Sequence, residues 1–330
     1  MRTVLILNPV AGKSRLAETQ EEPKSIEEDL STALRIYDIE PEVWHTSLED
    51  PGEGMARKAA NDHVDPVIAA GGDGTIHAVA SGLMSRESTL GIIPMGTMNN
   101  LAHSLGIPPS IEAACAVLAK GKTRSIDVGL INEQTFLEVA GIGFEASLFP
   151  AGEEFKKTGL ISTLRGVIMG LVSLFTFKPT RLKISIDEKK MRPYDAIQVT
   201  ICNAPYYGAH FQVAPDILMD DGMLDVFIFR HFSKLEYLRH AISISQGRCV
   251  FQPKIVRRRV KALRITSSDP LDIQADGMPC GQTPAIVKVV MGTLRVRVPS
   301  THVPGLMDDT GFEADFWQIA NTKRGKKAPS

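Results

Sequence analysis

The sequence carries almost no net charge, because 37 lysines and arginines stand against 38 aspartates and glutamates and leave a formal charge of −1. A chain without an excess of positive charge has no overall field to attract DNA or RNA, so nucleic acid is not an expected partner. Cysteine is scarce as well, with no C-x-x-C pair and no histidine spaced to complete a zinc site. The four residues are Cys115, Cys202, Cys249 and Cys280. A reducing cytosol is therefore the expected location.

The sequence also lacks the uninterrupted run of roughly 20 apolar residues that a membrane span needs. The apolar run at residues 4–7 is too short for a signal peptide. The most apolar later stretch, residues 160–177, is interrupted by polar residues at 162, 163, 165 and 173. We expect a cytoplasmic protein that reaches a membrane only as a peripheral protein.

Three catalytic motifs are absent, namely G-x-G-x-x-G, H-E-x-x-H and G-x-S-x-G. A dinucleotide dehydrogenase, a zinc protease and an α/β-hydrolase therefore lose their usual support. The segment from Asn8 to Lys13 resembles the end of a Walker A loop, but Leu7 stands where that motif requires its first glycine. The segment is not a P-loop, although Lys13 could still pair with a phosphate as a point charge.

What the sequence does contain is a regular alternation of strands and helices in its first third. At about 150 residues per domain, a chain of 330 residues makes roughly two domains. Apolar runs predict strands at 4–7, 42–46, 66–70 and 90–94, and helical periodicity lies between and after them, through residue 105. This pattern predicts an α/β domain with a parallel sheet at 1–127.

The rhythm changes after about residue 127. Short alternating or apolar runs bounded by turns predict strands at 135–140, 181–187, 196–202, 224–229, 262–266, 271–275, 285–290 and 293–298. Helices are expected only at 160–177 and 234–246. We predict a β-rich, sandwich-like domain at 128–300, followed by a segment at 301–330 that ends in a disordered basic tail.

Two glycine-bearing loops follow strands of the first domain. Residues 71–75 read Gly-Gly-Asp-Gly-Thr, and residues 96–100 read Gly-Thr-Met-Asn-Asn. Glycines let a backbone approach a phosphate, and the N–H groups at a helix start point towards it. A tight turn and an asparagine-rich helix cap are the alternatives. Because ligands bind beyond the carboxyl ends of parallel strands, these loops and the one after residue 7 predict a nucleotide site.

Taken in order, five segments resemble the diacylglycerol kinase catalytic family, especially its soluble bacterial lipid kinases; sphingosine and ceramide kinases share the module. They are Asn8-Pro9 with Gly12-Lys13, residues 71–75, residues 94–99, Asp221-Gly222 and Asp276-Gly277. The similarity runs from about residue 1 to 300. It implies a nucleotide-binding domain that holds ATP, a β-rich lipid-substrate domain, and transfer of the γ-phosphoryl group to the hydroxyl group of diacylglycerol or a related lipid.

The resemblance also implies site residues. Asp276 would be the catalytic acid–base group, and Asp73 would act through Mg²⁺ and water. Asp221, with the carbonyl groups of Leu218 and Met223, would hold a structural Mg²⁺, against the alternative of a plain hairpin turn. Asp127 would orient the site. The nucleotide would be held by Asn8, Pro9, Gly12, Lys13, Thr46, Gly71, Gly72, Asp73, Gly74, Thr75, Gly96, Thr97 and Asn99.

The sequence departs from the family pattern at two acids. Met278 stands where the family commonly continues Asp-Gly-Glu, and Asn100 replaces an aspartate often seen after the Gly-Thr-x-Asn motif. A nucleotide- or lipid-binding regulator without turnover is therefore the alternative function. An NAD kinase also shares the Gly-Gly-Asp-Gly loop, but the Asn-Glu motif of that family has no evident counterpart, since Asn99 is followed by Asn100.

The expected partner is a lipid substrate at a membrane surface. Association of two copies of the chain into a homodimer is left open. Residues 160–177 could line the acyl pocket or lie on the interface, with core packing as the alternative. The basic runs at 257–261 and 323–327 could face anionic lipid, with a solvated face as the alternative.

Overall fold

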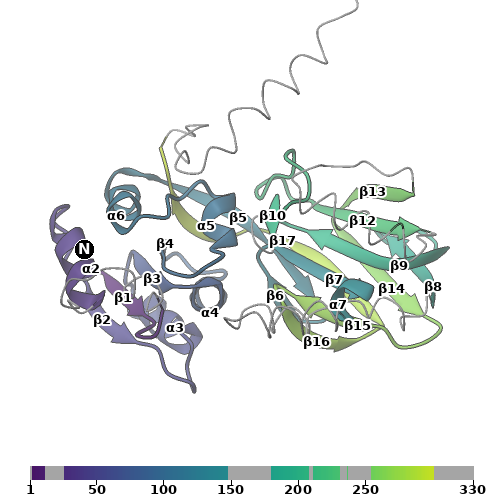
Figure 1. The fold of residues 1–330 in the computed structure, drawn as a ribbon, viewed down its shortest axis with the longest axis horizontal. Coiled ribbons are helices and arrows are strands. Elements are labelled where there is room, and N and C mark those ends of the chain that lie inside the picture. The colour runs from purple at the N-terminus through teal and green to yellow at the C-terminus, as the bar shows by residue number, and fades with distance from the viewer. Residues whose placement is uncertain are drawn as a thin grey trace, which may run out of the picture.

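The computed structural model describes residues 2–11, 26–147, 180–207, 211–230, 236 and 254–300. The helix expected at 160–177, most of that expected at 234–246, the tail beyond 300, and Gly12 and Lys13 lie outside these residues. Two halves lie side by side, one of mixed helices and strands and one built mainly of strands (Figure 1). Within the described part of the chain, no helix has the length and apolar character needed to cross a membrane.

The N-terminal half is a parallel sheet with helices packed on it, as the alternation predicts. Its strands run in the order β4-β3-β1-β2, and all three pairings are parallel. β1, β3 and β4 are buried along their whole length, which explains their continuous apolar sequences. The elements are β1 (Val4–Leu7), α2 (Ile26–Arg35), β2 (Glu42–His45), α3 (Glu53–Asn61), β3 (Val67–Gly71), α4 (Asp73–Leu83), β4 (Leu90–Pro94), α5 (Asn100–Ser104) and α6 (Ile111–Lys120).

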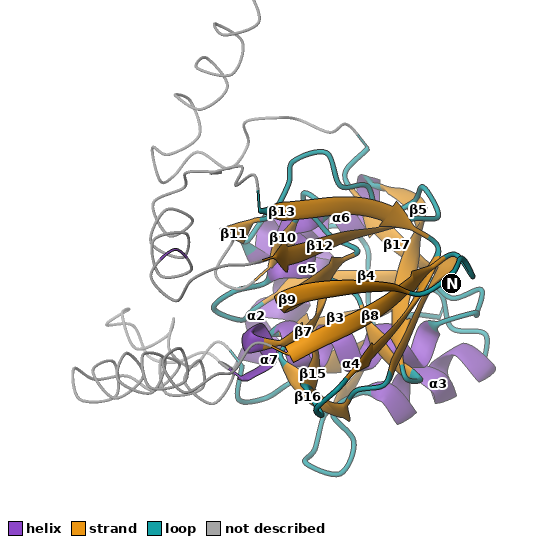
Figure 2. Cartoon of the chain, turned by 90° about the vertical axis from the view of Figure 1, so that its right-hand side faces the viewer, coloured by secondary structure: helices purple, strands orange, loops and turns teal. Residues whose placement is uncertain are grey.

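The C-terminal half is an antiparallel, β-rich structure, so the expected fold class is confirmed. Its main path runs β16-β15-β7-β9-β8-β14-β17, and β12 pairs with β9 and β13 (Figure 2). The elements are β5 (Lys122–Ile131), β6 (Gln134–Phe136), β7 (Val139–Gly143), α7 (Phe144–Ser147), β8 (Thr180–Ile186), β9 (Arg192–Cys202), β10 (Tyr206–Tyr207), β11 (Phe211–Gln212), β12 (Leu224–Arg230), β13 (Ile255–Val260), β14 (Ala262–Ser267), β15 (Asp272–Ala275), β16 (Met278–Gln282) and β17 (Ala285–Val298).

Strand β17 joins the two halves. Its first part pairs with β14, whereas near its end Val296 pairs with Leu90 of β4. The apolar core of the N-terminal half consequently includes Leu294, Val296 and Val298 from the far end of the chain. A division into continuous ranges at residue 127 does not describe this core, because the last strand returns to the first sheet.

Three local differences from the sequence prediction have physical reasons. The strands expected at 285–290 and 293–298 are one strand, whose register shifts between Val290 and Leu294 around Gly292, at φ 56°. The strand expected at 135–140 is divided into β6 and β7. The backbone N–H groups between them, those of Leu137 and Glu138, donate to the Asp276 carboxylate in the turn between β15 and β16. β13 was not predicted, because its three consecutive arginines interrupt the alternation of apolar and polar residues that indicates a strand.

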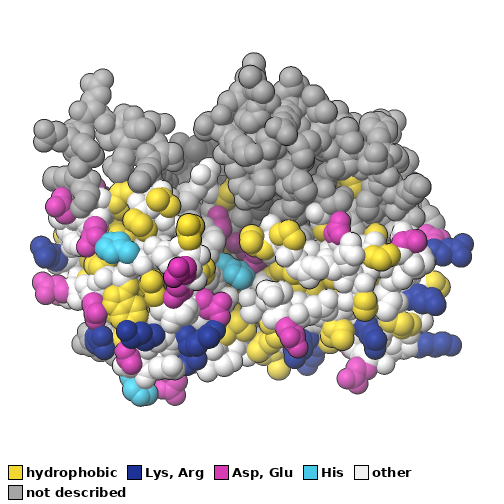
Figure 3. Space-filling model, turned by 90° about the horizontal axis from the view of Figure 1, so that it is seen from below, with side chains coloured by type: hydrophobic (Ala, Val, Ile, Leu, Met, Phe, Trp, Pro, Cys, Tyr) yellow, Lys and Arg dark blue, Asp and Glu magenta, His cyan; other side chains and the backbone are white. Residues whose placement is uncertain are grey.

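Charged side chains of both signs are interspersed over both halves on the face shown in Figure 3. This distribution agrees with the formal charge of −1. Two of the arginines in the basic run of β13 are paired with acids: Arg257 with Asp216 and Asp225, and Arg259 with Asp221. Much of the charge of this run is therefore used within the protein.

Candidate active site

The loops after β1, β3 and β4 meet at the carboxyl edge of the parallel sheet. The side-chain amide of Asn8 donates to Thr75 Oγ1 at 3.1 Å, which joins the first loop to the second. The second and third loops touch through glycine backbone, because a Cβ added to Gly96 would lie 2.6 Å from Gly72 Cα. Only glycine allows this approach. The three predicted loops therefore form one surface.

Asp73 fixes the third loop rather than pointing away from the protein. Its carboxylate accepts hydrogen bonds from the N–H groups of Asn99 and Asn100, at 2.9 and 2.7 Å, and so caps α5. Asn99 has a left-handed backbone, at φ 51°, and its side chain closes a ring of hydrogen bonds with Gly96. Gly74, in contrast, faces open space, since a Cβ there would meet nothing within 4 Å. A ligand has room to approach at that point.

The remaining predicted nucleotide residues lie around these loops. Pro9 is exposed directly after β1, and Thr97 is exposed in the loop after β4. Thr46 follows β2 and donates its N–H to the Leu7 carbonyl at 2.9 Å. Their contact with a nucleotide stays a prediction, as it does for Gly12 and Lys13.

Asp276 lies in the turn between β15 and β16, with a left-handed backbone at φ 44°. Its carboxylate accepts three backbone N–H groups, those of Leu137, Glu138 and Val139, at 2.6, 3.0 and 2.8 Å. These donors lie in or beside the break between β6 and β7. Burial raises the pKa of Asp276, while His77 and the three amide donors act in the opposite direction. The group is firmly held and a stronger base than an exposed aspartate.

His77 brings Asp276 into contact with the nucleotide half. It lies one turn after Asp73 on α4, and its Nε2 is 3.5 Å from Asp276 Oδ2. The same nitrogen lies 3.2 Å from the carbonyl oxygen of Thr135. Sequence reasoning missed His77, although its spacing of four residues from Asp73 places both on one helix face.

Glu138 is a second residue that the sequence prediction missed. It is 7% exposed, and its carboxyl group accepts hydrogen bonds from the Asn100 side chain and the Leu101 N–H. Burial raises the pKa of Glu138 well above its ordinary value, and the carboxyl groups of Asp276 and Asp73 raise it further. The sequence feature that could have indicated Glu138 is its place as a single acid within the apolar run at 136–140.

The turn expected to hold a structural Mg²⁺ has a different arrangement. One carboxylate oxygen of Asp221 accepts the Met223 N–H at 3.0 Å, and the other is bonded to the guanidinium of Arg259. Leu218 is 52% exposed. Because Arg259 already supplies a positive charge at this carboxylate, the turn as arranged does not fit a resident Mg²⁺.

Asp127 is buried and ties this turn to β17. Its carboxylate accepts the N–H groups of Gly222 and Gly292, both at 2.7 Å. The side chain of Asn203 then donates to the carbonyls of Asp127 and Leu137, each at 2.9 Å. Asp127 is therefore linked through Asn203 to the strand break that holds Asp276.

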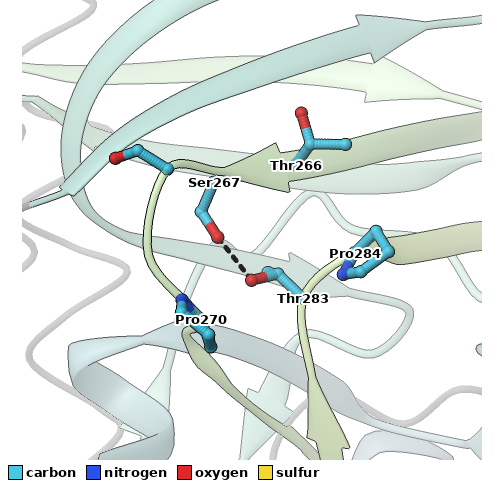
Figure 4. Close-up of a pocket in the computed structure, with 6 residues that line it drawn as sticks. Thr266, Ser267, Pro270, Thr283 and Pro284 are labelled. Carbon is cyan, nitrogen blue, oxygen red and sulfur yellow. Dashed lines mark hydrogen bonds between the residues drawn. The ribbon is translucent and has the colours of Figure 1, made fainter.

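A separate hollow of about 220 Å³ lies between the end of β14 and the start of β17 (Figure 4). Ser267 and Thr283 are joined there through their hydroxyl groups. None of the site residues lines this hollow. Its walls are formed by Thr266, Ser267, Ser268, Pro270, Thr283 and Pro284.

Comparison with known proteins finds a family match for each half of the chain. Residues 2–131 match the family described as diacylglycerol kinase catalytic domain, and residues 141–298 match the YegS C-terminal NAD kinase beta sandwich-like domain. A diacylglycerol kinase from Bacillus subtilis (strain 168) is 30% identical over 314 residues, which cover 93% of this chain and 99% of the relative. The chain belongs to the diacylglycerol kinase catalytic family. It is therefore an enzyme of the lipid kinase class.

Further diacylglycerol kinase relatives extend over most of the chain. One from Staphylococcus aureus (strain MRSA252) is 28% identical over 287 residues, covering 86% of this chain and 88% of the relative. A crystal structure of a diacylglycerol kinase from Bacillus anthracis (strain Sterne) superposes with a TM-score of 0.68 at 23% identity, covering 90% of this chain and 96% of that one. The latter similarity supports the fold of both halves. In this chain, the position after Asp276-Gly277 is Met278, which has no ionisable group and is 69% exposed. This position therefore contributes no acid to the site.

Proposed function

We propose that the protein transfers the γ-phosphoryl group of ATP, supplied as its Mg²⁺ complex, to the hydroxyl group of a lipid, with diacylglycerol as the expected acceptor. The observation that carries the proposal is the position of Asp276. It is held by three amide donors at a strand end and reaches His77 on the helix that begins with the glycine-rich loop. A base beside a phosphate-binding loop is what phosphoryl transfer to an alcohol requires.

In the proposed reaction, the lipid oxygen forms a bond to the γ-phosphorus while the bond from that phosphorus to the β-phosphate oxygen breaks. The products are a lipid phosphate and ADP. Asp276 takes the hydroxyl proton as the new bond forms, and its raised pKa makes it a better proton acceptor. Bound Mg²⁺ supplies neutralisation of phosphate charge.

The nucleotide is proposed to lie on the joined loops after β1, β3 and β4. Gly74 allows the phosphates to approach the backbone at the start of α4, where the N–H groups of a helix N-terminus favour negative charge. The Asp73 carboxylate keeps the third loop in place through Asn99 and Asn100. The lipid then enters from the C-terminal half, with its headgroup hydroxyl at Asp276 and its chains reaching towards a membrane surface.

The test is phosphoryl transfer by the purified full chain. ATP labelled in its γ-phosphate is supplied with Mg²⁺ and mixed micelles that contain diacylglycerol, monoacylglycerol, phosphatidylglycerol, sphingosine or ceramide, and NAD is offered in a parallel reaction. We expect label in diacylglycerol. Label in NAD alone would overturn the lipid assignment, and bound ATP without any labelled product would favour the regulator.

A further inference from the structure

One buried acid beside the site belongs to none of the nucleotide loops and takes no part in the proposed proton transfer. Glu138 lies between β6 and β7 and is 7% exposed. Burying an ionisable group in this way is costly and is rarely retained without partners. At the same time, two positions where the family resemblance implies an acid hold Asn100 and Met278 instead. Glu138 is therefore a third carboxyl group beside those of Asp73 and Asp276, and its role needs an explanation.

Glu138 contacts both halves of the molecule. On the nucleotide side, its carboxyl group accepts hydrogen bonds from the Asn100 side chain and the Leu101 N–H at the start of α5. On the other side, its own N–H donates to Asp276 Oδ1 at 3.0 Å, and its carbonyl accepts the Asn203 N–H at 2.8 Å. Glu138 thus connects the loop after β4 with the backbone N–H groups that bind Asp276, the proposed base.

We propose that Glu138 is a positioning residue of the kinase site: its carboxyl group joins Asn100 to the strand break that holds Asp276, and so fixes the distance between the nucleotide loop and the proton acceptor. Asp73 completes the connection, since it accepts the Asn100 N–H at 2.7 Å. Glu138 acts through Asp276 and Asn100 and takes no proton from the substrate. The inference rests on the proposed function, because it assigns a role within that same site.

The surroundings of Glu138 favour its neutral form. Asp276 faces it from the β15–β16 turn and Asp73 from the start of α4, and both acids add to the effect of burial in raising the pKa of Glu138. His77 lies beyond Asp276, and His103 of α5 packs against a tyrosine ring. A neutral carboxyl group keeps its hydrogen bonds and adds no negative charge beside Asp276. When the pH rises through its pKa, ionised Glu138 repels Asp276 and the phosphates.

The experiment compares Glu138→Ala and Glu138→Gln with the matched control Glu133→Gln, which changes an exposed turn acid of the same half. Because a misplacement of about 1 Å can cost about 100-fold in rate, Glu138→Ala should lower kcat by about 10- to 100-fold. Glutamine resembles a neutral glutamic acid, so Glu138→Gln should keep kcat within about three-fold at pH 7 and should lose the decline of kcat at alkaline pH. The control should match the wild type throughout.

Thermal unfolding supplies a measurement that is independent of activity. A carboxyl group whose pKa is raised in the folded state binds its proton more tightly there than in the unfolded chain. The wild type therefore loses the contribution of Glu138 to stability as the pH rises above about 4.3, the pKa of an unfolded glutamate, and Glu138→Gln lacks this part of the pH dependence. The Tm of Glu138→Gln should equal or exceed that of the wild type, and the gap should widen from pH 5 to pH 8.

Two results would overturn the inference. One is a kcat for Glu138→Ala within two-fold of the wild type, in a variant that still melts cooperatively. The other is a Glu138→Gln variant that loses activity and Tm together, which would indicate an ordinary structural role. Absence of any lipid product with the wild type would instead contradict the proposed function, and the pH dependence of the Tm gap would still test whether Glu138 is buried as a neutral acid.

Discussion

The turn at Asp276-Gly277 and the turn at Asp221-Gly222 share a dipeptide, a left-handed glycine and a place in the C-terminal half. Their surroundings are opposite. Asp276 accepts three backbone N–H groups and lies 3.5 Å from a histidine, His77. Asp221 forms an ion pair with a permanently charged arginine, Arg259. The same sequence motif therefore yields an available base in one turn and a neutralised carboxylate in the other.

The difference teaches that the residues around an Asp-Gly turn decide its chemistry. Amide donors orient a carboxylate without removing its capacity to accept a proton, and burial strengthens it as a base. A guanidinium instead forms an ion pair with the carboxylate and offsets its charge. Substitutions at the two turns should therefore have unequal effects.

Replacing each aspartate by asparagine should separate the turns most clearly. Asp276→Asn should lower kcat by about 100-fold or more with ATP affinity nearly unchanged, because an amide cannot accept the hydroxyl proton. Asp221→Asn should leave kcat within about three-fold, since the lost charge is one already neutralised by Arg259. Initial rates of lipid phosphorylation and the Tm of both variants provide the measurement. Equal losses of kcat would remove the functional distinction between the turns.

Much of the nucleotide side could be predicted from the sequence because its signals are local. Each glycine-bearing segment follows a buried strand, as the pattern of neighbouring residues predicted, although α4 begins at Asp73, inside the segment predicted to be a turn at 71–75. The parallel order of the strands then brings the loops together without any knowledge of side-chain contacts.

The remainder of the site depends on contacts between distant residues. Glu138 and Asp276 form a hydrogen bond although they lie 138 positions apart in the sequence. His77 contacts Asp276 only because α4 packs against the C-terminal half. The pairing of Asp221 with Arg259 likewise needs β13, whose arginine-rich sequence did not predict a strand. No local pattern contains this information, so the resemblance indicated the acids but not their partners.

The glycine loops can be tested with a pair of alanine substitutions. In Gly96→Ala the new Cβ would lie 2.6 Å from Gly72 Cα, which is backbone and cannot turn aside, so the variant should lose about 1–3 kcal/mol of stability. Gly74→Ala meets nothing within 4 Å and lies in α4, so it should gain up to about 1 kcal/mol without nucleotide. Its methyl group would occupy the space expected for phosphate, and ATP should then bind more weakly.

The measurement is the Tm of each variant with and without MgATP. Gly74→Ala should melt at or above the wild-type temperature alone and show a smaller rise with MgATP. A full rise with MgATP would place the phosphates elsewhere. If Gly96→Ala were as stable as the wild type, the close approach of the two loops would not be required.

His77 should have a smaller effect, expressed mainly in the pH dependence. His77 holds the pKa of Asp276 down, so His77→Ala lets that pKa rise. Because the base must be ionised to accept a proton, the acid limb of the kcat/KM profile should move to higher pH. The control is His45→Ala, which changes an exposed histidine of β2. A profile that stays in place would show that His77 does not act on Asp276.

The smallest effect is expected at the Asp221-Gly222 turn, where Arg259 supplies the positive charge beside the Asp221 carboxylate. The pair is partly exposed, with Asp221 at 20% and Arg259 at 50%, so Arg259→Met should cost less than about 1 kcal/mol. The wild-type Tm should be the same in EDTA and in Mg²⁺ without nucleotide. In Arg259→Met, the freed carboxylate and the nearby carbonyls form an oxygen-only donor set of the kind Mg²⁺ prefers, so Mg²⁺ should restore the Tm.

Arg258→Met is the matched control for this prediction, because Arg258 donates to the carbonyl of Arg257 and changes no contact of Asp221. It should show no response to Mg²⁺. A wild-type Tm that falls in EDTA would mean that a metal ion is resident at the turn together with Arg259. In that case the two Asp-Gly turns would differ in the ligand they hold as well as in their charge, and the magnesium site predicted from the sequence would be restored.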